Sequence, residues 1–221
     1  MLVQIYEISS PEEARALGAL GVDHIGVLVG DGSFPREQSV DRARRIFSAI
    51  PPSCKGVALS LSADLRLIEQ IVSELKPAIL HLGASTDLLT PTAVRQLKKQ
   101  YRALPLMRSI PVIGDESIAI AQSYDGLADL LLLDSHRAGD VQIGAIGVTH
   151  SWQLDKKIVD KVGIPVIIAG GLGPDNVINA INTARPAGVD SKTKTDKSDG
   201  SHTKDLEKVK QFVDRAKSLQ H

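Results

Sequence analysis

The chain has 221 residues, and its 26 lysines and arginines balance 26 aspartates and glutamates, so the net charge is zero. A neutral chain with 3% aromatic residues lacks the positive field and the stacking side chains typical of nucleic-acid-binding proteins. The one cysteine, Cys54, cannot form an internal disulfide, and neither a signal segment nor a run of apolar residues long enough to cross a bilayer is seen. We expect a cytoplasmic protein with no nucleic acid and no membrane as partner.

Short apolar segments alternate with amphipathic segments along the whole sequence. The expected strands are residues 2–6, 24–29, 55–61, 78–82, 104–110, 129–134, 164–168 and 188–190. Helices are expected after each strand. Two of them begin at Ser10 and at Thr90, each followed by proline. Five more span residues 39–50, 64–75, 116–124, 152–162 and 204–218, and the helix of the seventh unit runs to residue 184.

Eight such units predict a parallel sheet with helices outside it, closed into a single-domain (βα)8 TIM barrel over residues 1–221. An open doubly wound sheet is the alternative, but no G-x-G-x-x-G motif follows the first strand. In a barrel, functional side chains gather after the carboxyl ends of the strands. The residues at these positions are Tyr6, Glu7, Arg36, His81, Arg108, Asp134, the 139–149 loop, Gly170, Gly171 and the segment after Asp190.

Two of these positions suggest a chemistry. Asp134 ends the apolar run DLLLLD, so we expect a buried strand end where loss of water raises the pKa of a proton donor. A loop cap is the alternative interpretation of Asp134. Gly170 and Gly171 lie between a strand and a helix that begins with Pro174, and their free amides suit a phosphate. An ordinary turn is the alternative there.

Several motifs together resemble the phosphoribosylanthranilate isomerase family of tryptophan biosynthesis. They are IPVIIAGGLGPDNVINAI with the ARPAGVD that follows it, Pro35-Arg36 with Ser39, LLLDS at 131–135, and Gly144, Gly147, Thr149 and Trp152 after the sixth strand. The family opens a phosphorylated ribosyl amine by an Amadori rearrangement, with a Cys on the first strand as base and an Asp on the sixth as acid. The resemblance implies a small phosphorylated or carboxylate substrate and no cofactor, and it leaves a homodimer open.

Roles transfer by matching position. The resemblance implies Asp134 as the acid and Arg36 as a contact for the substrate carboxylate, because the guanidinium fork matches a carboxylate. Substrate contacts in the loop after the sixth strand would come from Gly144, Gly147 and Thr149. The phosphate would lie on Gly170 and Gly171.

The expected base is missing, because Tyr6 stands where the family has its Cys. A phenol with a usual pKa of about 10 is a poor base at neutral pH, and Cys54 lies too early to replace it. His81 is a candidate base because imidazole titrates near neutrality, with an interior, hydrogen-bonded histidine as the alternative. Glu7 is another candidate, although strand alternation should send it away from Tyr6.

The segment after the eighth strand also departs from the family. Where the family has Val-Ser-Ser-Gly-Val-Glu, this chain has SKTKTD at 191–196. Lys192 and Lys194 could hold the phosphate through ammonium groups, and Thr193 through its hydroxyl. The polar run to Lys204 could instead be a mobile solvated loop, or a lid that orders around a ligand.

Three functions therefore stay open. The first is an isomerase of phosphoribosylanthranilate or a related ribosyl amine, and the second is a different TIM-barrel enzyme acting on a small phosphosugar or carboxylate. The third is a non-catalytic relative that binds an anion. The histidines show no ligand spacing with acids or cysteines, so we expect no metal site.

Overall fold

The computed structural model describes residues 1–137, 139–144 and 149–218, and eight parallel strands in it form a closed barrel. The strands are β1 (Leu2–Ile5), β2 (His24–Leu28), β3 (Lys55–Ser60), β4 (Ile79–Leu82), β5 (Leu106–Val112), β6 (Leu130–Ser135), β7 (Val166–Ile168) and β8 (Gly188–Ser191). They pair in chain order, and β8 closes the ring on β1 with Leu2 opposite Gly188. The predicted (βα)8 barrel is confirmed.

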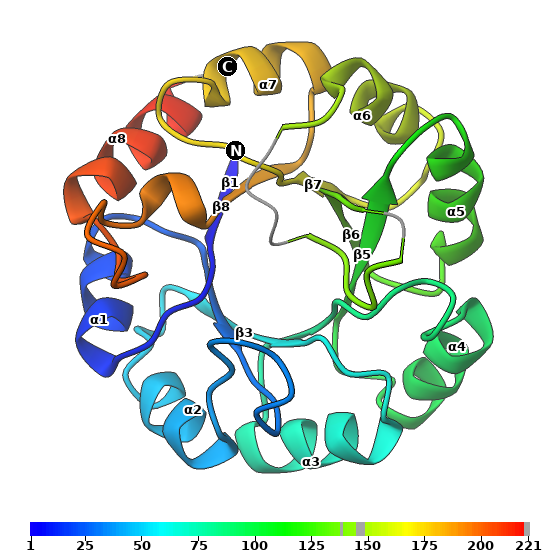
Figure 1. The fold of residues 1–221 in the computed structure, drawn as a ribbon, viewed down its shortest axis with the longest axis horizontal. Coiled ribbons are helices and arrows are strands. Elements are labelled where there is room, and N and C mark those ends of the chain that lie inside the picture. Colours follow the sequence, from blue (N-terminus) through cyan, green and yellow to red (C-terminus); the bar gives the residue numbers. More distant parts are fainter. Residues whose placement is uncertain (138, 145–148, 219–221) are drawn as a thin grey trace.

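In the part of the chain that the structure describes, eight helices surround the strands as an outer ring (Figure 1). They are α1 (Pro11–Ala19), α2 (Val40–Phe47), α3 (Leu65–Leu75), α4 (Pro91–Gln100), α5 (Glu116–Tyr124), α6 (Trp152–Val159), α7 (Val177–Ala184) and α8 (Leu206–Lys217), with a 3-10 helix η1 (Thr193–Thr195). The predicted caps are in place: the Ser10 and Thr90 side chains accept from Glu13 N and Ala93 N. None of the described helices is long and apolar enough to cross a membrane.

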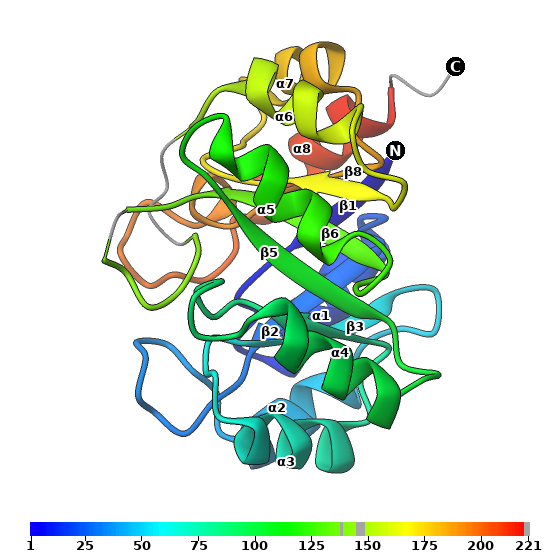
Figure 2. The ribbon, with the colours of Figure 1, turned by 90° about the vertical axis from the view of Figure 1, so that its right-hand side faces the viewer.

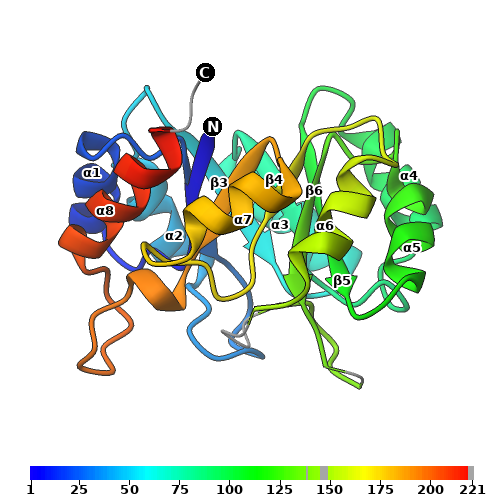
Figure 3. The same ribbon diagram turned by 90° about the horizontal axis from the view of Figure 1, so that it is seen from above.

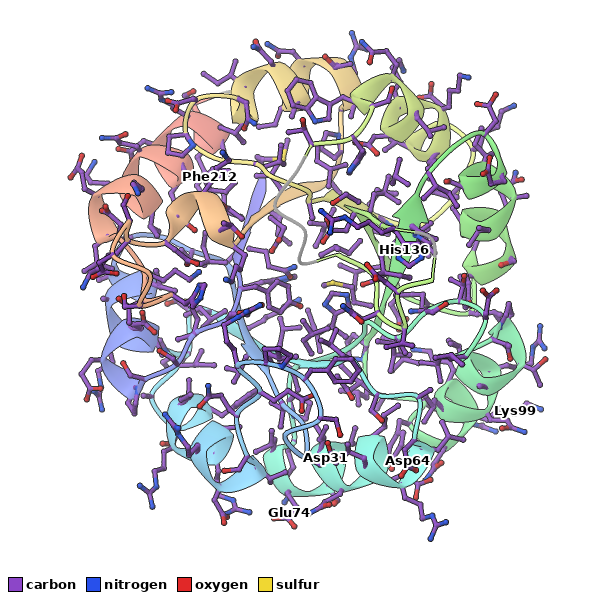
Figure 4. The ribbon with its side chains drawn as sticks, in the orientation of Figure 1. Asp31, Asp64, Glu74, Lys99, His136 and Phe212 are labelled. Carbon is purple, nitrogen blue, oxygen red and sulfur yellow. The ribbon has the colours of Figure 1, made fainter. Side chains whose placement is uncertain are left out.

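Two apolar layers hold the barrel together. The larger layer lies between strands and helices, where Phe212 of α8 is fully buried on the side of its helix that faces the barrel (Figure 4). The smaller layer fills the barrel interior with Tyr6, Val57, Ile79, Met107, Leu132, Ile167 and Ala169. A filled interior confines any ligand to the ends of the strands.

The long segments after β2 and β8 project from one end of the barrel, while the chain termini lie at the other (Figures 2 and 3). This is the carboxyl end of the strands, where the sequence places most of its candidate residues. β1 is shorter than predicted, because regular pairing stops at Ile5 and Glu7 has a left-handed backbone with φ of 59°. That difference changes which way Glu7 points.

Candidate active site

A cavity of about 480 Å³ opens at the carboxyl end of the barrel. Its walls bring together five of the residues predicted from sequence, namely Tyr6, Glu7, His81, Asp134 and Lys192. A smaller pocket of about 330 Å³ is lined by Gly170, Gly171 and Thr193. Because Asp134, Asp190 and Lys192 line both spaces, the two form adjoining parts of one site.

Asp134 lies near the end of β6. Burial raises the pKa of its carboxyl from 3.8 to about 6, although Oδ1 accepts from the Ser135 amide at 2.7 Å. Gly144 packs directly against the other oxygen: a Cβ at Gly144 would lie 2.1 Å from Asp134 Oδ2. Gly144 therefore borders the cavity wall at Asp134, where a side chain would displace the carboxyl.

We expect Gly144→Ala to lower kcat/KM in any reaction that uses Asp134, by about 10²-fold, because a displacement of about 1 Å is enough for such a loss. Gly139→Ala is the matched control. Both glycines have a positive φ, 90° for Gly144 and 94° for Gly139, but at Gly139 no atom of the described residues beyond its chain neighbours lies within 4 Å of the Cβ position. A thermal melt of Gly139→Ala therefore reports the cost of the left-handed backbone alone, that of Gly144→Ala adds the clash with Asp134, and only Gly144→Ala should lose activity in the folded protein. Equal activity in the two would contradict the role of this contact.

Asp190 at the end of β8 is a candidate that sequence reasoning did not assign. It lines both spaces, and its Oδ1 accepts from Gln4 Nε2 at 3.2 Å. Burial, and then the charge of Asp134, raise the pKa of Asp190 well above 3.8. The signal was available, because GVD ends an apolar strand with an acid as DLLLLD does. Two coupled carboxyls that hold one proton offer one donor and one acceptor.

Tyr6, His81 and Ser109 form a hydrogen-bonded chain across the cavity floor. The Tyr6 hydroxyl lies 2.5 Å from His81 Nδ1, and His81 Nε2 lies 2.7 Å from Ser109 Oγ. Burial raises the pKa of Tyr6 well above 10 and lowers the pKa of His81 to about 3. The imidazole is therefore neutral, with both nitrogens engaged, as in the interior-histidine alternative. A protonated phenol donates to Nδ1, which leaves the Nε2 proton for Ser109.

Glu7 faces the same cavity as Tyr6, so the prediction from strand alternation was wrong about its direction. The left-handed backbone at Glu7 breaks the alternation that a regular strand would impose. Its Oε2 lies 2.5 Å from Arg36 Nε, and its Oε1 accepts from Arg36 Nη2 at 3.3 Å. This hydrogen bond raises the pKa of Arg36. Arg36 therefore already holds a carboxylate of its own chain.

The polar segment after β8 is folded against the barrel. Asp196 is buried and pairs with Lys192 at 3.1 Å and with buried Lys204 at 2.5 Å, and the backbones of Asp196 and Lys204 form an antiparallel bridge. Thr195 in η1 is fully buried as well. Ion pairing, rather than apolar packing, thus orders a segment whose composition allowed a solvated loop.

Three further predicted contacts lie elsewhere or outside the described residues. Lys194 lines a separate surface pocket with Gly173 and Asn176. Thr149 is exposed. Gly147 lies outside the described residues, so its predicted substrate contact stays a prediction.

Fold and site together define a TIM-barrel protein with a candidate acid–base site and a neighbouring glycine-lined pocket. The family model for N-(5'-phosphoribosyl)anthranilate (PRA) isomerase matches residues 5–215. The PRA isomerase of Methanocella arvoryzae is 34% identical, with 97% of each chain covered. This chain therefore belongs to the PRA isomerase family.

Solved structures are similar over the same extent. The PRA isomerase of Pyrococcus furiosus matches with a TM-score of 0.79 and 25% identity, covering 99% of this chain and 100% of the other. A second PRA isomerase, at 0.78 and 23%, with the same coverage, is in complex with reduced 1-(o-carboxyphenylamino)-1-deoxyribulose 5-phosphate. That relative thus binds a ligand with both a carboxylate and a phosphate.

Proposed function

We propose that this protein isomerises N-(5'-phosphoribosyl)anthranilate to the corresponding 1-deoxyribulose 5-phosphate. The observation that carries the proposal is the pair of carboxyls, half-buried Asp134 and buried Asp190, which share a cavity at the carboxyl end of the barrel in a chain of this family. The reaction only moves protons and opens a ring, so the proposal requires no cofactor.

The reaction needs one proton donor and one acceptor. The donor protonates the ring oxygen of the ribose, the bond from that oxygen to C1 breaks, and the nitrogen lone pair forms a C=N bond. A base then removes the proton from C2, and the resulting enol takes up a proton at C1 and releases the proton of its C2 hydroxyl to become the ketone. We assign the donor to Asp134, at the acid position of the family, and the acceptor to Asp190. Tyr6 is a poor acceptor because its pKa lies well above 10.

The small pocket supports a phosphate site. Gly170 and Gly171 both have left-handed backbones, with φ of 76° and 63°, and turn the chain tightly between β7 and α7. Lys192 and Thr193 line the same pocket and add an ammonium group and a hydroxyl. In this proposal Arg36 binds the anthranilate carboxylate at the cavity mouth. Lys194 faces the neighbouring surface pocket and contributes only long-range charge.

The direct test follows the fluorescence of N-(5'-phosphoribosyl)anthranilate in the presence of the purified protein. We expect the signal to fall faster than in buffer, at a rate proportional to protein concentration. A rate equal to that in buffer, with folded protein, would overturn the proposal and favour another small phosphosugar as substrate. A homodimer and cytoplasmic residence stay predictions.

A further inference from the structure

The carboxylate of Glu7 bridges two cations at the mouth of the cavity. Its Oε2 lies 2.5 Å from Arg36 Nε and 3.5 Å from Lys192 Nζ. The side chain of Glu7 is 10% exposed and that of Lys192 15%. Such a largely desolvated contact is stronger than an ion pair in open solvent.

The backbone is strained at both Glu7 and Arg36, the two partners of this contact. Glu7 and Arg36 both have left-handed φ values, 59° and 68°, which residues with a side chain rarely adopt. Each such residue is strained and persists only where its surroundings hold it in place. The 2.5 Å ion pair between the two side chains supplies such a hold.

The charges around Glu7 form one connected group. Arg36 and Lys192 contact Glu7, while Lys192 and Lys204 contact Asp196. Without Glu7, Arg36 would lose the carboxylate with which it pairs, while Lys192 and Lys204 would keep Asp196. A carboxylate supplied by a ligand would then replace the missing charge. With Glu7 present, that place is already filled.

We propose that Glu7 is a specificity-determining residue whose carboxylate occupies the subsite formed by Arg36 and Lys192, so that a ligand carboxylate binds there only by displacing it. The identity of that ligand, an N-aryl aminosugar phosphate, rests on the proposed function. The subsite therefore discriminates weakly between aryl groups with and without a carboxylate. A neutral residue at position 7 restores the discrimination.

The test compares two stable probes in calorimetric titrations. One is reduced 1-(o-carboxyphenylamino)-1-deoxyribulose 5-phosphate, and the other is its counterpart with a plain phenyl group. For Glu7→Gln we expect affinity for the carboxylated probe to rise about 10-fold or more, because its carboxylate no longer has to displace that of Glu7 from a charge-assisted pair with Arg36. Affinity for the phenyl probe should stay within about twofold. Glu7→Gly should act alike and relieves the left-handed strain.

Glu12→Gln is the matched control, because it removes the same charge from the exposed start of α1, where Glu12 pairs with exposed Arg15. It should change neither affinity. A Glu7→Gln variant that changes both affinities equally, or neither, overturns the proposal for Glu7. Binding of both probes with this difference but without turnover overturns the proposed function and supports the role of Glu7. Absence of binding to both folded proteins overturns both.

Discussion

Asp134→Asn is expected to lower kcat/KM for N-(5'-phosphoribosyl)anthranilate by about 10² to 10⁴-fold, the usual loss when a general acid is removed. The amide keeps the shape of the carboxyl and its contact with the Ser135 amide, but it cannot donate a carboxylic proton. Progress curves of substrate fluorescence, at several substrate concentrations, measure the loss. Asp41→Asn, on an exposed side chain of α2, is the control and should leave kcat/KM unchanged.

Asp134→Asn is also expected to stabilise the fold at neutral pH. Burial raises the pKa of Asp134 to about 6, so the folded state holds its proton more tightly than the unfolded state, where the pKa is near 3.8. Stability from this group is therefore present at low pH and is lost as pH rises from about 4 to about 6, on the order of 3 kcal/mol in total. The free energy of unfolding of Asp134→Asn, measured by denaturant unfolding at pH values from about 4 to about 6, should not show this decline.

The activity of the unchanged protein should fall on the acid side. As pH falls through about 6, Asp134 takes up a proton, and because the pKa of Asp190 is also raised, the pair loses its acceptor for the C2 proton. A kcat/KM profile that stays flat from pH 7 to pH 5 would contradict the carboxyl pair. Unchanged kcat/KM in folded Asp134→Asn would remove Asp134 from the donor role.

Tyr6→Cys is expected to lower the free energy of unfolding by about 2 to 4 kcal/mol, because it opens a cavity in the barrel interior. Tyr6 is 4% exposed, and its ring lies over Gly26, where a Cβ would meet it at 2.0 Å. The substitution also leaves His81 Nδ1 without its hydroxyl partner. We further expect kcat/KM to rise about 10-fold or more, since a thiol with a usual pKa of about 8.5 is a far better base than this phenol.

Tyr6→Phe separates these effects, because it keeps the ring and removes only the hydroxyl. Its expected loss of stability is about 1 to 3 kcal/mol, and kcat/KM should stay within a few-fold. Urea unfolding and the fluorescence assay measure both quantities. A loss of activity in Tyr6→Phe as large as that in Asp134→Asn would identify Tyr6 as the base. Unchanged activity in a folded Tyr6→Cys protein would show that position 6 does not reach the reacting carbons.

Much of the site was predictable because its signals are local. Asp134 ends an apolar strand, and Gly170 and Gly171 separate a strand from a helix, so their places at the carboxyl end follow from eight repeated units. The direction of Glu7 was not predictable, because a left-handed residue follows β1 where alternation predicts an extended one. The burial of Asp196 was equally hidden, since its partners Lys192 and Lys204 decide it.

The sequence by itself determined the order of strands and helices, the barrel and the family resemblance, because apolar period, caps and glycine turns act over a few residues. Only the tertiary structure decided which titratable groups meet. Tyr6 and His81 are 75 residues apart and Gln4 and Asp190 are 186 apart, and closure of the barrel joins both pairs. Burial and neighbouring charge then set the pKa values, which are properties of that assembled site and not of any segment of the chain.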